Sequence, residues 1–310
     1  MSGMSATRDP AASLRAVTWR SLAEGVGQIF FQANPWTGLL ILAAFLVADW
    51  QMALLAAIGT IIGTLAGCLV GFDADNVGMG MQGFNGCLVG AAVYTALGAQ
   101  GWAYVLTPVG AVLTAPLTLF FAWLFARPAL KGFNLPYTTA PFCTAASILY
   151  AASTSIHVES SAKHVVDGTG DAFLTSLLTN VSEVVLVNSV WAGALILLGL
   201  FIASWKVGLA AVMGSVLGSL TALAMGESAS TIEQGLAGYS GVLTAIALAV
   251  VFHQANVASW CYAAVGTVVT AVVTLLMNDA TTFPHYTWPY ILTTWVFLLI
   301  GSKIAALRRT

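Results

Sequence analysis

Long apolar stretches separated by single charged residues dominate this chain. The intervals without Asp, Glu, Lys or Arg are 25–48, 50–72, 76–126 and 132–158 in the first half, and 184–205, 207–226, 234–278 and 280–302 in the second. A helix that crosses a bilayer needs about 20 mostly apolar residues. The intervals 76–126 and 234–278 are each long enough for two crossings, so the pattern predicts five spanning helices in each half.

Two stretches of the chain occur twice in one register. GQIFFQANPWTG (27–38) returns as SEVVLVNSVWAG (182–193), and MQGFNGCLVG (81–90) returns as LAGYSGVLTA (236–245), both 155 positions later. A third pair, LPYTTAPF (135–142) and FPHYTWPY (283–290), is 148 positions apart, which predicts a loss of seven residues in the second copy. A register kept over this length indicates an internal duplication.

An odd number of crossings in each copy inserts the second copy from the opposite side of the bilayer. Inverted repeats of this kind are typical of transporters and channels, whose solute path lies where the copies meet. We assign an N-terminal arm to 1–24, the first repeat to 25–154, a connecting loop to 155–181, the second repeat to 182–302 and a C-terminal tail to 303–310. Ten crossings place both termini on one side, and the Arg and Lys residues near both ends predict that this side is cytoplasmic, in the cell (inner) membrane.

Composition supports an all-α integral membrane protein. Hydrophobic residues make up 59% of the chain and charged residues 7%, against about 25% charged in a typical soluble domain. A net charge of -2 argues against a nucleic-acid partner, which requires a basic face. The four cysteines lie in apolar stretches without CxxC spacing, so we predict no disulfide, metal or other cofactor.

Two kinds of segment predict irregular backbone at membrane depth, which is tolerated only in protein or beside a water-filled cavity. Residues 71–90 combine several glycines with Asn and Asp, and a similar segment follows at 225–243. We interpret this pair as pore wall, with a glycine-rich turn and close helix packing as the alternative. Prolines five apart, Pro136 with Pro141 and Pro284 with Pro289, predict broken or re-entrant elements with free carbonyls, since each proline removes a backbone donor.

These motifs together resemble the urea transporter family, in a bacterial member. The resemblance rests on G-x-x-Q near the first span, NPWTGLLIL (34–42), GFNGCLVG, the L-P-x-x-T-x-P-F motif and the second copies of all of them, over roughly residues 25–302. It implies a homotrimer in the lipid bilayer, with one pore per protomer between two inverted five-helix halves, that carries urea down its gradient.

The resemblance also implies site residues. Gln28 and Glu183 would be paired side-chain acceptors, and Thr139 and Thr287 would be the hydroxyls at the constricted middle. The apolar walls of flat slots would be Phe31, Phe84, Leu88, Val184, Leu186, Tyr239 and Leu243. Tyr239 stands where the first copy has Phe84, and the second proline motif is altered, so the polarity and width of one pore mouth are left open.

Simpler interpretations exist for these residues. Glu183 follows Ser182 and could sit at a helix start, where an acidic residue is favoured. The threonines could bond back to the preceding turn, and the apolar side chains could be ordinary helix packing. The mirrored positions of Gln28 and of both threonines favour the pore instead.

The sparse charge predicts passive permeation. Urea is neutral and planar with several N–H donors, and burying an unpaired amide costs several kcal/mol, so a narrow path must offer oxygens at its edge and apolar faces at its sides. We find no set of charges in the repeat motifs to bind a coupling ion. The alternatives are a channel for another small neutral solute (a short amide, ammonia or water), an enzyme, for which the histidines and carboxylates are too scattered, and a scaffold, which does not explain mirrored prolines.

Overall fold

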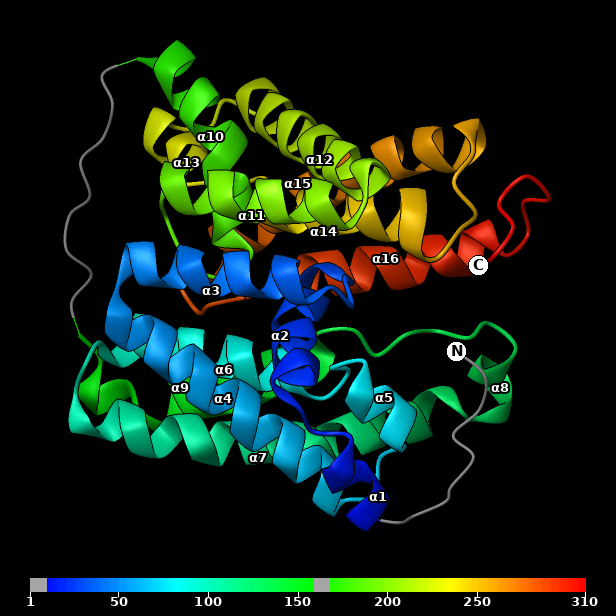
Figure 1. Cartoon of the computed structure of the whole chain (residues 1–310). Helices are drawn as coiled ribbons and strands as arrows, with labels where there is room; N and C mark the ends of the chain where they lie inside the picture. The colour runs from blue at the N-terminus through cyan, green and yellow to red at the C-terminus, as the bar shows by residue number, and fades with distance from the viewer. Residues whose placement is uncertain (1–9, 159–167) are drawn as a thin grey trace. The chain divides into compact units, whose positions relative to one another are not determined.

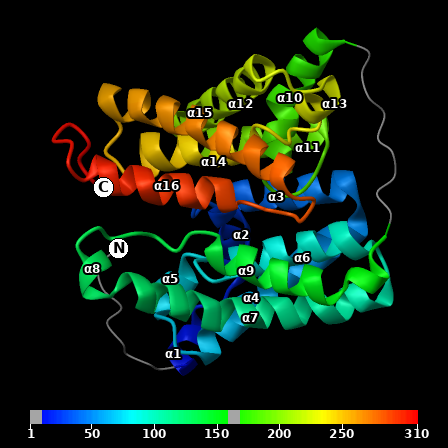
Figure 2. The ribbon, with the colours of Figure 1, turned by 180° about the vertical axis from the view of Figure 1, so that it is seen from behind.

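The computed structural model describes residues 10–158 and 168–310. In these ranges the regular elements are all helices, joined by short connections. Two compact units divide the chain, Met1–Glu159 and Ser160–Thr310. Their boundary falls inside the segment predicted to connect the two repeats. Figures 1 and 2 show the helices of each unit from opposite sides.

The elements of the two units follow the same order along the chain. The first unit contains α1 (Pro10–Arg15), α2 (Trp19–Gly27), the 3-10 turn η1 (Gln28–Phe30), α3 (Pro35–Ala48), α4 (Trp50–Leu69), α5 (Ala74–Gly78), α6 (Gly83–Leu97), α7 (Gly101–Phe125), α8 (Pro128–Lys131), α9 (Ala140–Ala152) and η2 (Thr154–Ile156). The second contains α10 (Thr169–Glu183), α11 (Val190–Ala203), α12 (Trp205–Ala224), α13 (Ala229–Glu233), α14 (Tyr239–Ile246), the π-helical turn η3 (Ala247–Val251), α15 (Val257–Ala280) and α16 (Trp288–Gly301).

Four helices in the described ranges are long and apolar enough to cross a membrane, namely α4, α7, α12 and α15. A fifth span is possible if Trp19–Phe30 and Pro35–Ala48 are counted together, but these two segments meet at a bend of 76°. The interval 25–48, predicted as one crossing, is therefore broken. Shorter apolar helices are α6, α9, α11, α14 with η3, and α16.

Equivalent helices recur at nearly constant offsets in the two units, as the predicted internal duplication requires, and they refine its register. The starts of α3 and α11, of α4 and α12, and of α5 and α13 are each 155 positions apart. The starts of α7 and α15 are 156 apart, and those of α9 and α16 are 148 apart. A π-bulge is a local insertion into an α-helix, and η3, at the end of α14, accounts for the extra residue. The shortening comes afterwards, because residues 281–287 replace a longer connection that includes α8.

The buried faces of α7 and α15 match at this new offset of 156. Small residues and threonines alternate on both faces; the matched pairs are Gly110 with Gly266, Thr114 with Thr270, Ala115 with Ala271, and Thr118 with Thr274. The Thr118 and Thr274 hydroxyls donate to the carbonyls one turn earlier at 2.8 Å. These two hydroxyl groups are therefore satisfied by their own helices.

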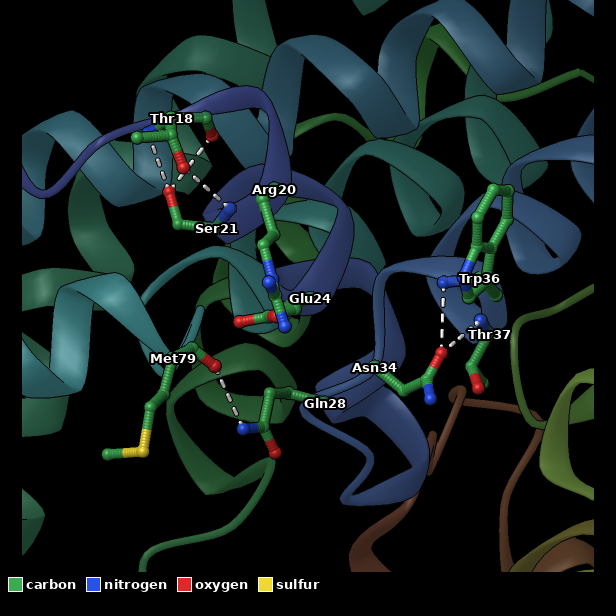
Figure 3. Close-up of polar contacts among 9 residues, drawn as sticks. All are labelled: Thr18, Arg20, Ser21, Glu24, Gln28, Asn34, Trp36, Thr37 and Met79. Atoms are coloured by element: carbon green, nitrogen blue, oxygen red, sulfur yellow. Dashed lines mark hydrogen bonds and ion pairs between the residues drawn. The ribbon is translucent and has the colours of Figure 1, made fainter. Parts of the chain in front are cut away.

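Both repeats begin earlier than the charge pattern indicated. Helix α2 starts at Trp19, inside the predicted arm, where Thr18 and Ser21 form a capping box, and α10 starts at Thr169, inside the predicted connecting loop. Glu24 lies directly before the first apolar interval and set its predicted start. Its side chain is nevertheless buried, and its Oε1 lies 2.7 Å from Nε of Arg20 (Figure 3). A count of charges misses this, because a paired carboxylate can stay inside a packed helix.

Glycines bring α4 and α6 into close contact. A Cβ on Gly86 would lie 2.1 Å from the carbonyl oxygen of Gly59, and a Cβ on Gly90 would lie 2.2 Å from that of Leu55. For these two glycines the alternative interpretation, close helix packing, is confirmed, whereas pore lining by other residues of the segment stays a prediction. The reason is that the segment becomes regular helix from Gly83 onward, so its glycines face a neighbouring helix.

The predicted C-terminal tail packs against the connection between η3 and α15. The backbone N–H of Gln254 donates to the Arg308 carbonyl at 2.8 Å, and Asn256 Nδ2 donates to the Ala306 carbonyl at 3.2 Å. Leu307 between these contacts is buried. The tail is thus part of the second unit's folded structure.

We expect Gly86→Ala to destabilise the first unit by about 1–3 kcal/mol, because the new methyl group overlaps a carbonyl on α4 that cannot move away. The thermal stability of the detergent-purified protein measures this. Gly78→Ala is the matched control, since nothing lies within 4 Å of a Cβ there. Equal melting temperatures for the two variants would contradict the packing role.

Candidate functional site

The first unit changes direction at a helix end that carries a large residue in a left-handed conformation. Phe31 has φ 63°. Its N–H donates to the Gln28 carbonyl at 3.0 Å, and the Gln32 N–H donates to the Gly27 carbonyl at 3.1 Å. These two bonds form a Schellman motif, which normally has glycine at the left-handed position.

The second unit has the same turn at the equivalent place. Leu186 also has φ 63°. Its N–H donates to the Glu183 carbonyl at 2.9 Å, and the Val187 N–H donates to the Ser182 carbonyl at 3.2 Å. The two copies therefore share one backbone structure, although their side chains differ.

Other helix ends in this chain show that glycine is available for such turns. Gly71, after α4, has φ 83°, and Gly226, after α12, has φ 78°, each with the same pair of backbone bonds. The left-handed conformation costs a residue with a Cβ about 1–2 kcal/mol. Strain of this kind is concentrated at functional sites, which points to a role for the Phe31 and Leu186 side chains.

Gln28 is held by one end of its amide. Its Nε2 donates to the Met79 carbonyl at 3.0 Å, across the turn between α5 and α6. Figure 3 shows the amide oxygen of Gln28 pointing away from Met79. This partly buried side chain can therefore present an acceptor to a solute, as its predicted role requires.

Glu183 is the last residue of α10, so its interpretation as an acid favoured at a helix start is wrong. A negative charge is disfavoured at a helix C-terminus, and the helix dipole gives no reason for Glu183. The carbonyl equivalent to that of Met79 belongs to Gln234, and it accepts from Asn188 Nδ2 at 3.1 Å. Glu183 does not have to fill the anchoring role that Gln28 fills.

The apolar candidates fall into two groups. Phe31 and Leu186, at the strained turns, are partly buried. The other five are buried. Val184 is the C-cap of α10. Phe84 and Leu88 lie one turn apart on α6, and Tyr239 and Leu243 lie one turn apart on α14. Packing within the unit can account for such burial, so pore lining by this group stays a prediction.

The two proline segments are irregular, as predicted, and end in equal geometry. Thr139 (φ -92°, ψ 11°) precedes α9 and Thr287 (φ -96°, ψ 16°) precedes α16. Each follows a residue with positive φ, Thr138 at 46° and Tyr286 at 49°. Neither threonine lies within a helix, and both side chains are buried.

Helices α6 and α14 contact these turns through different bonds. In the first unit Asn85 Oδ1, on α6, accepts from the Phe142 N–H of α9 at 3.2 Å. In the second unit the Tyr239 hydroxyl, on α14, donates to the Tyr286 carbonyl at 2.5 Å. Within each unit the candidate helix and the proline turn are therefore in direct contact.

Sequence reasoning missed Asn180, which positions α10. Its Nδ2 donates to the Ser215 carbonyl at 3.1 Å, to Ser215 Oγ at 3.0 Å and to Ser219 Oγ at 2.8 Å, and all three side chains are buried. The residue 155 positions earlier is Gly25, so the repeat could not signal it. An Asn between the apolar residues Leu177, Leu178 and Val181 was the available signal.

The part of the chain that the structure describes contains no cluster of potential metal ligands. No group of three or more His, Cys, Asp or Glu side chains there could hold an ion. What the breaks do offer is hydrogen-bond acceptors beside apolar side chains.

Comparisons with known proteins agree on one family. A family model described as urea transporter matches residues 19–302. Urea transporter 1 of Ovis aries and that of Capra hircus are each 30% identical over 313 residues, covering 96% of this chain and 80% of theirs. Urea transporter 1 of Rattus norvegicus is 29% identical over 320 residues with the same coverage.

We expect Asn180→Ala to lower the free energy of unfolding by about 1–3 kcal/mol, since it leaves a buried carbonyl and two buried hydroxyls with one donor fewer. Thermal unfolding in detergent measures the change. Asn278→Ala, at an exposed position on α15, removes the same amide without touching that network. If both variants unfold at the wild-type temperature, Asn180 does not hold α10.

Proposed function

We propose, from the premise that this chain belongs to the urea transporter family, that urea crosses the membrane along a path lined by the two strained turns. As a family member the protein transports urea passively and is not an enzyme. The proposal concerns which residues contact the solute and how.

This assignment rests on the observation that the strained turns at Phe31 and Leu186 have the same backbone conformation. Both have φ 63°, both follow a residue that offers side-chain oxygen, Gln28 or Glu183, and both break an apolar segment. A turn needed only for packing would use glycine, as the chain does at Gly71 and Gly226. Two copies that keep a bulky residue there at a cost in free energy support a function for the side chain itself.

The chemistry of urea matches what these turns offer. Its edge carries N–H donors that lose water in a narrow path and need new acceptors. Oxygens of Gln28 and Glu183, with backbone carbonyls of the broken segments, would accept these hydrogens in succession, as carbonyls replace a hydration shell in ion filters. The flat faces of urea would pack against the apolar side chains of Phe31, Phe84, Leu88, Val184, Leu186, Tyr239 and Leu243, and the hydroxyls of Thr139 and Thr287 would meet it midway.

We further propose ten crossings in two inverted repeats, with the path between them and both termini in the cytoplasm. The shared helix order of the two units supports the repeats, and the shorter apolar helices would supply the remaining crossings. Three protomers would assemble in the cell membrane, each with its own path, as the family resemblance suggests.

Electrostatics supports transport without a coupled ion. The one ion pair recorded among the described residues joins Arg20 and Glu24, and a carboxylate paired in this way is not available to Na⁺ or H⁺. Glu183 alone, without a second acidic residue beside it in the repeat motif, does not make a cation site.

We expect Glu183→Gln to lower the urea permeability of proteoliposomes about three- to tenfold, because an amide can turn a donor toward the solute. Thr139→Val should lower it about two- to tenfold through the loss of one hydrogen bond. Stopped-flow light scattering of liposomes with purified protein measures urea entry.

Matched controls make the same chemical changes away from the path. Asp279→Asn alters an exposed acid at the end of α15, and Thr144→Val removes a hydroxyl that bonds its own helix at 2.9 Å. Both should keep wild-type permeability. Wild-type permeability in Glu183→Gln and Thr139→Val as well would refute the site and leave the family unaffected.

Urea entry should not depend on an ion gradient. We expect equal initial rates with a proton gradient, with a sodium gradient, and after either is collapsed by an ionophore. The same light-scattering assay measures the rates. A rate that falls with the gradient would disprove passive permeation.

A further inference from the structure

The two repeats differ in hydrogen bonding at the carbonyl that precedes each proline-turn threonine. We infer that Tyr239 is a specificity-determining residue, because its hydroxyl occupies one acceptor position of the Tyr286 carbonyl and so leaves the second repeat with one position fewer for a solute. The inference rests on the proposed function, in which both proline turns face the urea path.

The bond in the second unit is well defined. Tyr239 is the first residue of α14 and is 7% exposed. Its hydroxyl donates to the Tyr286 carbonyl, 2.5 Å away and 47 residues later in the chain. Tyr286 comes directly before Thr287, so the occupied carbonyl lies at the turn that would meet the solute midway.

The first unit lacks this donor. Phe84 stands at the position equivalent to Tyr239 and has no hydroxyl. Among the hydrogen bonds of the described residues, none ends on the carbonyl of Thr138, the residue equivalent to Tyr286. The nearby Phe142 N–H is directed to Asn85 Oδ1 instead. The Thr138 carbonyl therefore has no phenol donor, and under the proposed function it can accept from a solute.

Backbone differences do not explain the contrast. The positive φ values are 46° at Thr138 and 49° at Tyr286, and the following threonines agree within 5° in φ and ψ. Two carbonyls in the same backbone geometry thus differ in whether a phenol donates to one of them. That difference comes from the hydroxyl group that Tyr239 has and Phe84 lacks.

The consequence depends on how many N–H₂ groups a solute has. Urea has two, one at each side of its carbonyl, and can use an acceptor in each repeat. Acetamide has a methyl group in place of one of them and can use only one. Covering the Tyr286 carbonyl therefore weakens the preference of the path for urea over a simple amide.

Tyr239→Phe tests this with the residue that the first repeat already uses. We expect the ratio of urea to acetamide permeability to rise about two- to tenfold, the value of one additional neutral hydrogen bond. Phe84→Tyr introduces the phenol in the first repeat and should lower the ratio by a similar factor. Both permeabilities are measured by stopped-flow light scattering of proteoliposomes.

A purely structural role gives a different result. If the phenol only holds the Tyr286 turn in place, Tyr239→Phe lowers the melting temperature and changes both permeabilities together, and an unchanged ratio overturns the inference. Thermal unfolding of the same preparations shows whether each variant is folded. Absence of urea entry in wild-type liposomes would refute the proposed function itself, which distinguishes the two failures.

Discussion

A backbone group in a bilayer must have a hydrogen-bond partner, and this constraint governs the whole molecule. Unpaired N–H and C=O groups cost several kcal/mol in hydrocarbon, so chains cross membranes as helices and interrupt them only inside protein or beside a hydrated path. In this chain the interruptions are not random. They occur at Schellman turns, which satisfy part of the backbone, and at proline turns, which leave carbonyls for other donors.

The duplicated units show which features the constraint enforces and which it leaves open. Turns after equivalent helices have nearly equal φ, as at Phe31 and Leu186. Side chains have more freedom than the backbone: a Cβ on Gly80 would lie 2.2 Å from the Gly25 nitrogen, and a Cβ on the equivalent Gly235 would lie 2.8 Å from the Asn180 nitrogen. The close backbone approach is therefore kept in both units, while Asn180 in place of Gly25 adds side-chain hydrogen bonds to α12 in the second unit only.

The same freedom makes the two halves of a duplicated transporter chemically unequal. A urea path needs acceptors in both halves, but the number of acceptors in each half depends on which protein donors already use them. Gln28 is tied to the Met79 carbonyl in one repeat, and Asn188 takes that role in the other. Tyr239 extends this pattern to the proline turns. Under the proposed function, such differences would adjust selectivity among small amides without changing the backbone.

The amino-acid sequence by itself determined the membrane class, the duplication, the order of the apolar segments and the family. The first three follow from composition and periodicity, because lipid demands long apolar runs and a duplication preserves spacing. The family follows from the resemblance of the repeated motifs. Gln28, Glu183 and the proline motifs were also recognisable, since the repeat mirrors them.

Only the tertiary structure decided what each polar group contacts. Glu24 ended an apolar interval in the sequence but is buried against Arg20, Glu183 proved to end a helix, and Asn180 had no mirrored counterpart. The π-turn before residue 252 shifted the register by one, which local composition does not reveal. The physical reason is that such a hydrogen bond joins atoms from distant parts of the chain, as between Tyr239 and Tyr286. The hydrophobic pattern, in contrast, is a local property of the sequence.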